Sequence, residues 1–316
     1  MPPLVPRARR ASRVLAVATL LAGVPASRSG TRAQQALVLG ALSLGMPHGA
    51  ADTELLRAAA GGSRRRHLGL LAAYAATGAA ATAVVHRGGR ATELAVLVAS
   101  AAHFAEGEVA CWPSPAPRGR SALRAVAAAL TTIAVPAAVG TARSSSGGVG
   151  SRAVGDRSGL ALLRSGEAGR TVLPLTAAAG AAAVALAAEG DRQAAADTAL
   201  LLALPLLAPP AASFAAYFGG WHSLRHTARV ADELVARGLL PAQRSLPAAL
   251  LALGRRSAWA AAVGIGGAAV LAARDPQRAS DNAFSAVLGL TVPHMATVAW
   301  QLARSRSLTA SGDAAS

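Results

Sequence analysis

Apolar runs of about 15 to 20 residues recur along most of this 316-residue sequence, and they constrain its fold more than any other feature. A helix needs a run of this length to cross the hydrocarbon core of a bilayer. Only 15% of the residues are charged, whereas a soluble domain usually carries about a quarter. Alternation of apolar and polar residues is nowhere sustained, which argues against a transmembrane β-barrel. The sequence therefore predicts an all-α, polytopic integral membrane helical bundle of about eight to ten helices, with multiple passes through the cell membrane.

The chain divides into three parts by composition. Residues 1–32 form a basic N-terminal segment, of which residues 1–13 are expected to be disordered or to lie on the membrane surface. The apolar run at 14–26 is too short to span comfortably, and it resembles either a short anchor or the middle of a signal peptide. Residues 33–302 are predicted to form the membrane-embedded domain, and 303–316 a disordered tail.

The apolar runs place the membrane spans within this domain. We expect them at about 33–48, 67–86, 92–110, 121–140, 171–189, 196–208, 211–236 and 283–302. Residues 247–273 form either one bent span or two short ones. Residues 141–170 are rich in Ser, Gly and Arg and should form an irregular hydrophilic loop. Pro209 and Pro210 should end one helix and allow another to begin near Ala211.

The net charge of +16 comes from arginine alone, because none of the 31 basic residues is lysine. The arginines are scattered over nearly every loop and form no single stripe, which excludes nucleic acid as a partner. Anionic head groups of membrane lipid are the expected counter-charge. A single cysteine, Cys111, excludes an intrachain disulfide and a thiolate cluster.

Histidines are the polar residues that stand out inside the apolar helices. Five of the seven lie there: His48, His103, His222, His226 and His294. Ionisable groups at membrane depth are rare and usually functional, and neutral imidazole is the commonest metal ligand. His222 and His226, in WHSLRH, are one helical turn apart and project from the same face. Any one of the five could be an ordinary packed and hydrogen-bonded histidine, but the presence of five together favours a metal site. The other two histidines, His67 and His86, lie at span ends and are interpreted as interfacial.

Carboxylates accompany two of these histidines. Asp52 lies four residues after His48, and Glu106 and Glu108 follow His103 closely. Such groups could accept the second ring N–H of a metal-bound imidazole. The ligand types alone are compatible with iron, copper, zinc or nickel and do not identify the metal. A di-iron site of membrane desaturases draws on roughly eight histidines, and a bis-His haem needs only two, so a mononuclear site is preferred.

Four motifs, GMPHGAAD, AAHFAEGE, YFGGWHSLRH and VPHM, resemble in this order the Brp/Blh family of membrane β-carotene 15,15′-dioxygenases. The resemblance covers about residues 33–302. The second motif departs from the family pattern, since Ala105 replaces a usual glycine and Glu108 a usual aspartate. The resemblance implies an Fe(II) enzyme that cleaves β-carotene, or a related carotenoid, centrally with O2 to give retinal. It implies His48, His103, His222 and His226 as metal ligands, with no catalytic residue beyond them, and suggests a functional link to a retinal-binding opsin.

The surroundings of the four ligand candidates give further expectations. Four aromatic side chains could line a tunnel for the polyene, although ordinary helix packing explains each of them equally well: Phe104, Tyr217, Phe218 and Trp221. His294 should shape the pocket from the last helix without binding the metal. If the four ligand candidates share one ion, their rings must converge within roughly 5 Å of a common centre.

Two functions of other classes remain open. One is a non-catalytic carotenoid- or retinal-binding membrane protein of the same fold. The other is a small transporter whose intramembrane histidines relay protons. Iron stoichiometry separates the enzyme from the transporter, and product analysis separates it from the binding protein.

Overall fold

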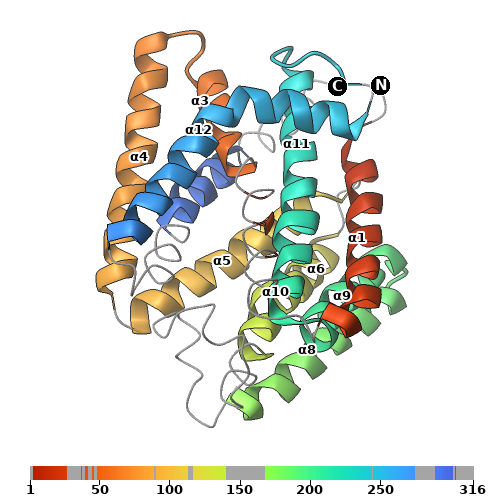
Figure 1. Cartoon of the computed structure of the whole chain (residues 1–316). Helices are drawn as coiled ribbons and strands as arrows, with labels where there is room; N and C mark the ends of the chain where they lie inside the picture. The colour runs from red at the N-terminus through yellow and green to blue at the C-terminus, as the bar shows by residue number, and fades with distance from the viewer. Residues whose placement is uncertain are drawn as a thin grey trace.

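The computed structural model shows a chain built from helices (Figure 1). It describes residues 3–26, 37, 40–41, 45, 48–88, 90–112, 117–139, 168–243, 245–274, 289–301 and 303, and no strand occurs among these residues. In chain order the α-helices are α1 (Val5–Ala26), α3 (Asp52–Ala59), α4 (Arg64–Arg87), α5 (Arg90–Ala110), α6 (Arg118–Ala129), α8 (Ala168–Ala188), α9 (Arg192–Leu207), α10 (Pro210–Phe214), α11 (Ser223–Ala236) and α12 (Leu246–Arg274). Two π-helical segments, η1 (Leu130–Ala134) and η4 (Ala215–His222), continue α6 and α10. A last helical segment covers 289–301.

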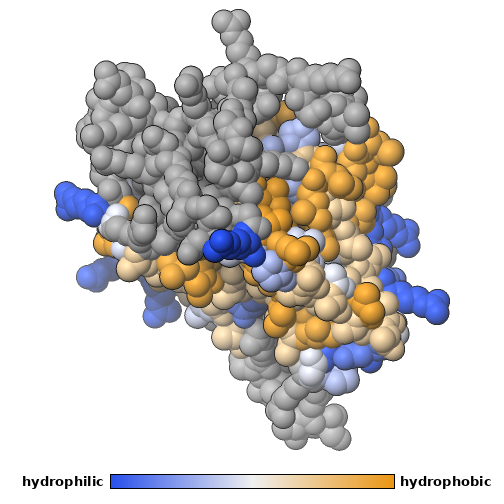
Figure 2. Space-filling view, turned by 90° about the horizontal axis from the view of Figure 1, so that it is seen from below, coloured by the Kyte–Doolittle hydropathy of each residue, from blue (hydrophilic) through white to orange (hydrophobic). Residues whose placement is uncertain are grey.

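Within the described residues, three helices are long and apolar enough to cross a membrane: Arg64–Val85, Gly119–Val139 and Arg170–Ala188. Figure 2 shows hydrophobic residues gathered over much of the described part of one face, with several hydrophilic residues projecting from its sides. The predicted all-α membrane bundle is confirmed. The segment 247–273 lies within one helix, α12, so two short spans are excluded. Most of the predicted loop at 141–170 and the tail after 303 lie outside the described residues.

The first helix extends further toward the N-terminus than predicted. It begins at Val5, within the segment expected to be disordered or to lie on the membrane surface. Leu4 and Ala8 are buried in a hydrophobic cluster with residues of α11 and α12. Asp232 of α11 accepts the backbone N–H of Leu4 at 2.8 Å and that of Val5 at 3.2 Å. The expected disorder of residues 5–13 is wrong, because one face of this half of the helix is buried, with Arg9 and Ser12 on it, and such a face leaves no long apolar run in the sequence.

The predicted break between α9 and α10 is confirmed. Ala208 and Pro209 are extended, with ψ angles of 155° and 147°. A residue that precedes proline is disfavoured in the helical region, and Pro210 suits the first turn of a new helix because its missing N–H is not needed there. From this point α10, η4 and α11 continue as one rod that carries His222 and His226.

A buried ionic network fixes this rod against its neighbours. Arg225 of α11 is 1% exposed and donates to Glu108 of α5 at 2.9 Å and to Asp197 of α9 at 3.1 Å. Its guanidinium also lies 3.7 Å from the ring centre of Trp221. Arg13 of α1 pairs with Asp197 at 2.5 Å. Because a buried charge is tolerated only when it is paired, the network sets how α1, α5, α9 and α11 pack together.

Candidate metal centre

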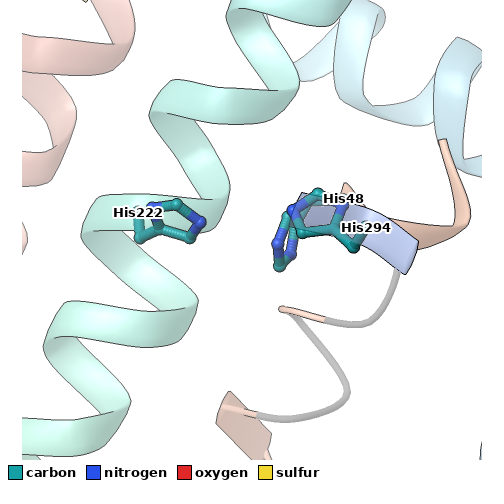
Figure 3. Close-up of side chains that lie close together, drawn as sticks. All are labelled: His48, His222 and His294. Carbon is teal, nitrogen blue, oxygen red and sulfur yellow. The ribbon is translucent and has the colours of Figure 1, made fainter. Parts of the chain in front are cut away.

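Five histidine side chains meet inside the bundle, and they come from four separate segments: His48 just before α3, His103 on α5, His222 and His226 on the α10–α11 rod, and His294 on the 289–301 helix. The ring centre of His48 lies 5.1 Å from that of His222 and 5.3 Å from that of His226. His103 lies 5.6 Å from His222. Figure 3 shows His222 projecting from its helix toward His48 and His294, which lie side by side. The rings of the four predicted ligands therefore lie in one connected cluster, in which the ring centres of His222 and His226 are 6.0 Å apart.

His294 takes a more central position than predicted. Its ring centre lies 4.9 Å from that of His48, 5.0 Å from His103 and 5.1 Å from His226. One nitrogen each of His48, His222 and His294 lie within 4.8 Å of one another. His294 therefore belongs to the cluster itself and does not merely line its edge. Spacing could not reveal this, because the position of the last helix relative to the others is a tertiary property.

The cluster contains nitrogens that lack a partner among the described residues. The five side chains are only 3–6% exposed. Four of them carry a buried Nε2 that has no hydrogen-bond partner within the described ranges: His103, His222, His226 and His294. Most buried polar atoms in folded proteins are satisfied, and leaving one unsatisfied costs about 1–3 kcal/mol. Several such nitrogens in one place suit a shared metal ion, since imidazole ligates iron, copper, zinc and nickel. The residues present therefore fit a metal.

The ring of His48 is oriented by two neighbours. Its Nδ1 donates to the carbonyl oxygen of Gly45, and the hydroxyl oxygen of Ser223 lies 3.1 Å from the same nitrogen. Because a carbonyl oxygen only accepts, Nδ1 carries the ring proton, and Nε2 of the neutral imidazole keeps its lone pair. A Cβ atom at Gly45 would overlap the ring of Phe218. Glycine is therefore needed at position 45 for the chain to approach the cluster this closely.

His226 has a partner of the opposite kind. Arg229 Nη2 lies 3.1 Å from His226 Nδ1, and Arg229 Nη1 donates to Gln301 at 3.1 Å. A guanidinium only donates, so Nδ1 of His226 accepts, and a neutral ring then holds its proton on Nε2. His226 would have to release Arg229 before its Nε2 could bind a metal.

The carboxylates form hydrogen bonds with other residues than those predicted. Asp52 was expected beside His48, but its Oδ2 lies 2.8 Å from Nδ1 of His294. Glu108 was expected beside His103, but it accepts from Arg225 and from the indole N–H of Trp221 at 3.1 Å. The expected partners differ because spacing along one helix does not show which side chains approach from other helices, although Asp52 does bond a histidine of the cluster. Glu106 is half-buried on α5.

Three of the four aromatic candidates contact the histidines. Phe104 lies 4.5 Å from His222 between ring centres, and Phe218 lies 5.6 Å from His48. Tyr217 packs on Phe104 at 5.4 Å. Trp221 is fully buried and is held by Arg225 and Glu108. Phe104, Tyr217 and Phe218 therefore border the cluster, whereas Trp221 belongs to the ionic network.

Sequence reasoning missed four residues that support the cluster: Tyr74, Ser223, Arg225 and Arg229. Ser223 and Arg225 lie inside the WHSLRH motif, and their polar side chains among apolar neighbours were a usable signal. Tyr74 lies in the middle of an apolar span, and its hydroxyl donates to Asp52 at 3.0 Å. A hydroxyl at such a depth requires a partner, which was the available clue.

Comparison with known proteins places the sequence in a family. Residues 39–301 match the model of a family described as Beta-carotene 15,15'-dioxygenase. The match includes all five histidines of the cluster and begins after α1. No curated protein and no solved structure matches the chain.

Proposed function

The chain belongs to the β-carotene 15,15′-dioxygenase family, and we propose that it is an iron-dependent membrane enzyme that cleaves β-carotene, or a related carotenoid, at its central double bond. The reaction breaks one carbon–carbon double bond and uses one O2. Each oxygen atom becomes the aldehyde oxygen of one product, so β-carotene gives two molecules of retinal. A retinal-binding opsin would be a suitable consumer of this product.

The observation that carries the proposal is the buried histidine cluster. Five rings lie together inside a helix bundle, and four of them have a buried Nε2 that finds no hydrogen-bond partner in the described part of the chain. By the motif resemblance His48, His103, His222 and His226 would hold the iron. Bound Fe(II) would supply the redox chemistry that O2 needs to react with a closed-shell polyene.

The chain's own residues prepare this site. Gly45 and Ser223 hold the ring of His48 in one orientation, and Phe104 and Phe218 cover the cluster with apolar rings. Such surroundings exclude water and match a substrate without polar groups. A linear carotenoid is comparable in length to the roughly 30 Å hydrocarbon core of a bilayer. We therefore propose that the substrate reaches the cluster from the membrane lipid, and that the protein is a multi-pass protein of the cell membrane.

The test is expression of the full chain in a bacterial host that produces β-carotene, with retinal measured by chromatography. Growth under ¹⁸O2 followed by immediate reduction to retinol prevents exchange of the aldehyde oxygen with water. One ¹⁸O per retinol is expected, and a His48→Ala variant should make no retinal. Retained carotenoid without retinal in the wild-type protein would instead support the non-catalytic binding protein.

A further inference from the structure

We propose that His294 is a further ligand of the metal centre and that Asp52 and Tyr74 are the residues that position it. The inference rests on the metal site of the proposed function. It adds a fifth ligating nitrogen, from the last helix, to the four histidines that the family resemblance implies as ligands.

The tautomer of His294 follows from its partner. The Nδ1 atom of His294 lies 2.8 Å from Asp52 Oδ2, and the two side chains are 6% and 1% exposed. A carboxylate oxygen accepts, so the ring proton lies on Nδ1. Nε2 of His294 then keeps its lone pair, and it is buried in the cluster without a partner among the described residues. Histidines that bind metals commonly donate their other N–H to a carboxylate in this way.

Asp52 is itself held from a third helix. The hydroxyl of Tyr74 on α4 donates to the same Oδ2 at 3.0 Å. Tyr74 shares a face of α4 with Gly78 and Thr82, because the three are spaced by four residues. A Cβ at Gly78 would touch Leu290 at 3.4 Å, and a Cβ at Gly289 would lie 2.6 Å from the backbone of Thr82. Close packing of α4 on the last helix therefore places His294 beside Asp52.

His294 is better prepared than His226 to bind a metal through its Nε2 atom. Arg229 faces Nδ1 of His226 and leaves its proton on Nε2, whereas Asp52 draws the proton of His294 to Nδ1. The carboxylate also offsets the charge of a buried cation. Of the two rings, His294 is the one whose Nε2 is ready to bind.

The test titrates Co²⁺ into the metal-stripped, full-length protein in detergent. Competition with a chelator measures the affinity, and the visible absorption bands report the ligand field. We expect His294→Ala to weaken binding at least tenfold and to shift the bands, because one nitrogen is lost. Asp52→Asn should weaken binding about 10- to 100-fold while the band positions stay near those of the wild-type protein. Tyr74→Phe should have a smaller effect of the same kind.

His67→Ala is the matched control, because His67 lies in the first turn of α4 and makes no ring contact with the cluster among the described residues. It should bind Co²⁺ like the wild-type protein. Unchanged affinity and bands in His294→Ala would overturn the inference. If that variant does not fold, His294→Gln and Asp52→Asn replace it, and unchanged affinity in Asp52→Asn overturns the positioning role. Wild-type protein that binds Co²⁺ but makes no retinal would contradict the proposed function alone.

Discussion

Asp52 and His294 are 242 positions apart in the sequence, yet they share a hydrogen bond of 2.8 Å inside the helix bundle. The bond joins the first residue of α3 to the last described helix. It also connects two of the four recognisable motifs, GMPHGAAD and VPHM. A carboxylate that orients an imidazole toward other imidazoles is a common arrangement around metal ions, so this pair supports a metal centre built from both ends of the matched region.

The histidines divide into two groups whose replacement by alanine should have different effects on retinal formation. Replacing any one of His48, His103, His222 and His226 by alanine should abolish retinal formation in the β-carotene-producing host, because each ring belongs to the cluster. His67→Ala and His86→Ala should retain nearly full activity, since both residues lie near the ends of α4. Equal losses in the two groups would show that the ligand assignment is wrong.

The contact of α4 with the last helix gives a second prediction. Gly289→Ala should lower retinal formation about 100-fold, a loss typical of a reacting group displaced by about 1 Å. Its Cβ would lie 2.6 Å from the Thr82 backbone, and the two helices would have to separate. Gly78→Ala is the control, because its Cβ would meet Leu290 and Pro293 at 3.4 and 3.6 Å, at or near ordinary contact distance. Activity and Co²⁺ affinity of both variants measure the effect, and equal behaviour would contradict it.

The sequence predicts the helices better than the contacts between them. Apolar runs locate α4, α5, α8 and α9, because membrane length and hydropathy are properties of a single segment. The break at Ala208 follows from two prolines. In contrast, the i,i+4 spacing assigned Asp52 to His48, although the carboxylate turns to His294. Which acceptor an imidazole finds depends on how helices pack, and one segment contains no such information.

Arg225 should be essential for the stability of the bundle. Arg225→Met leaves the carboxylates of Glu108 and Asp197 buried beside each other without their shared cation, and breaking a buried pair costs about 3–5 kcal/mol. Arg237→Met removes a partly exposed pair with Glu233 and should cost less than about 1 kcal/mol. Thermal unfolding of both variants in the same detergent tests this difference, and an equal melting temperature would refute it.

Asp232 should hold the N-terminus of α1 in place. Its carboxylate accepts the N–H groups of Leu4 and Val5. Asp232→Ala leaves these donors without their acceptor, at a cost of about 1–3 kcal/mol. Glu233→Ala, at the next position, is the matched control with an expected cost below about 1 kcal/mol. Limited proteolysis should cut the first ten residues faster in Asp232→Ala than in Glu233→Ala. Equal cleavage rates would mean that α1 is not held by this carboxylate.

The metal content of the purified protein shows whether the buried histidines bind iron. After anaerobic reconstitution with Fe(II) and removal of free metal, mass spectrometry should find about one iron per wild-type chain, because the donor set fits a single ion. The His48→Ala/His222→Ala double variant should bind essentially none. A wild-type protein without iron, or a double variant with the same iron content, would show that these histidines do not form an iron site.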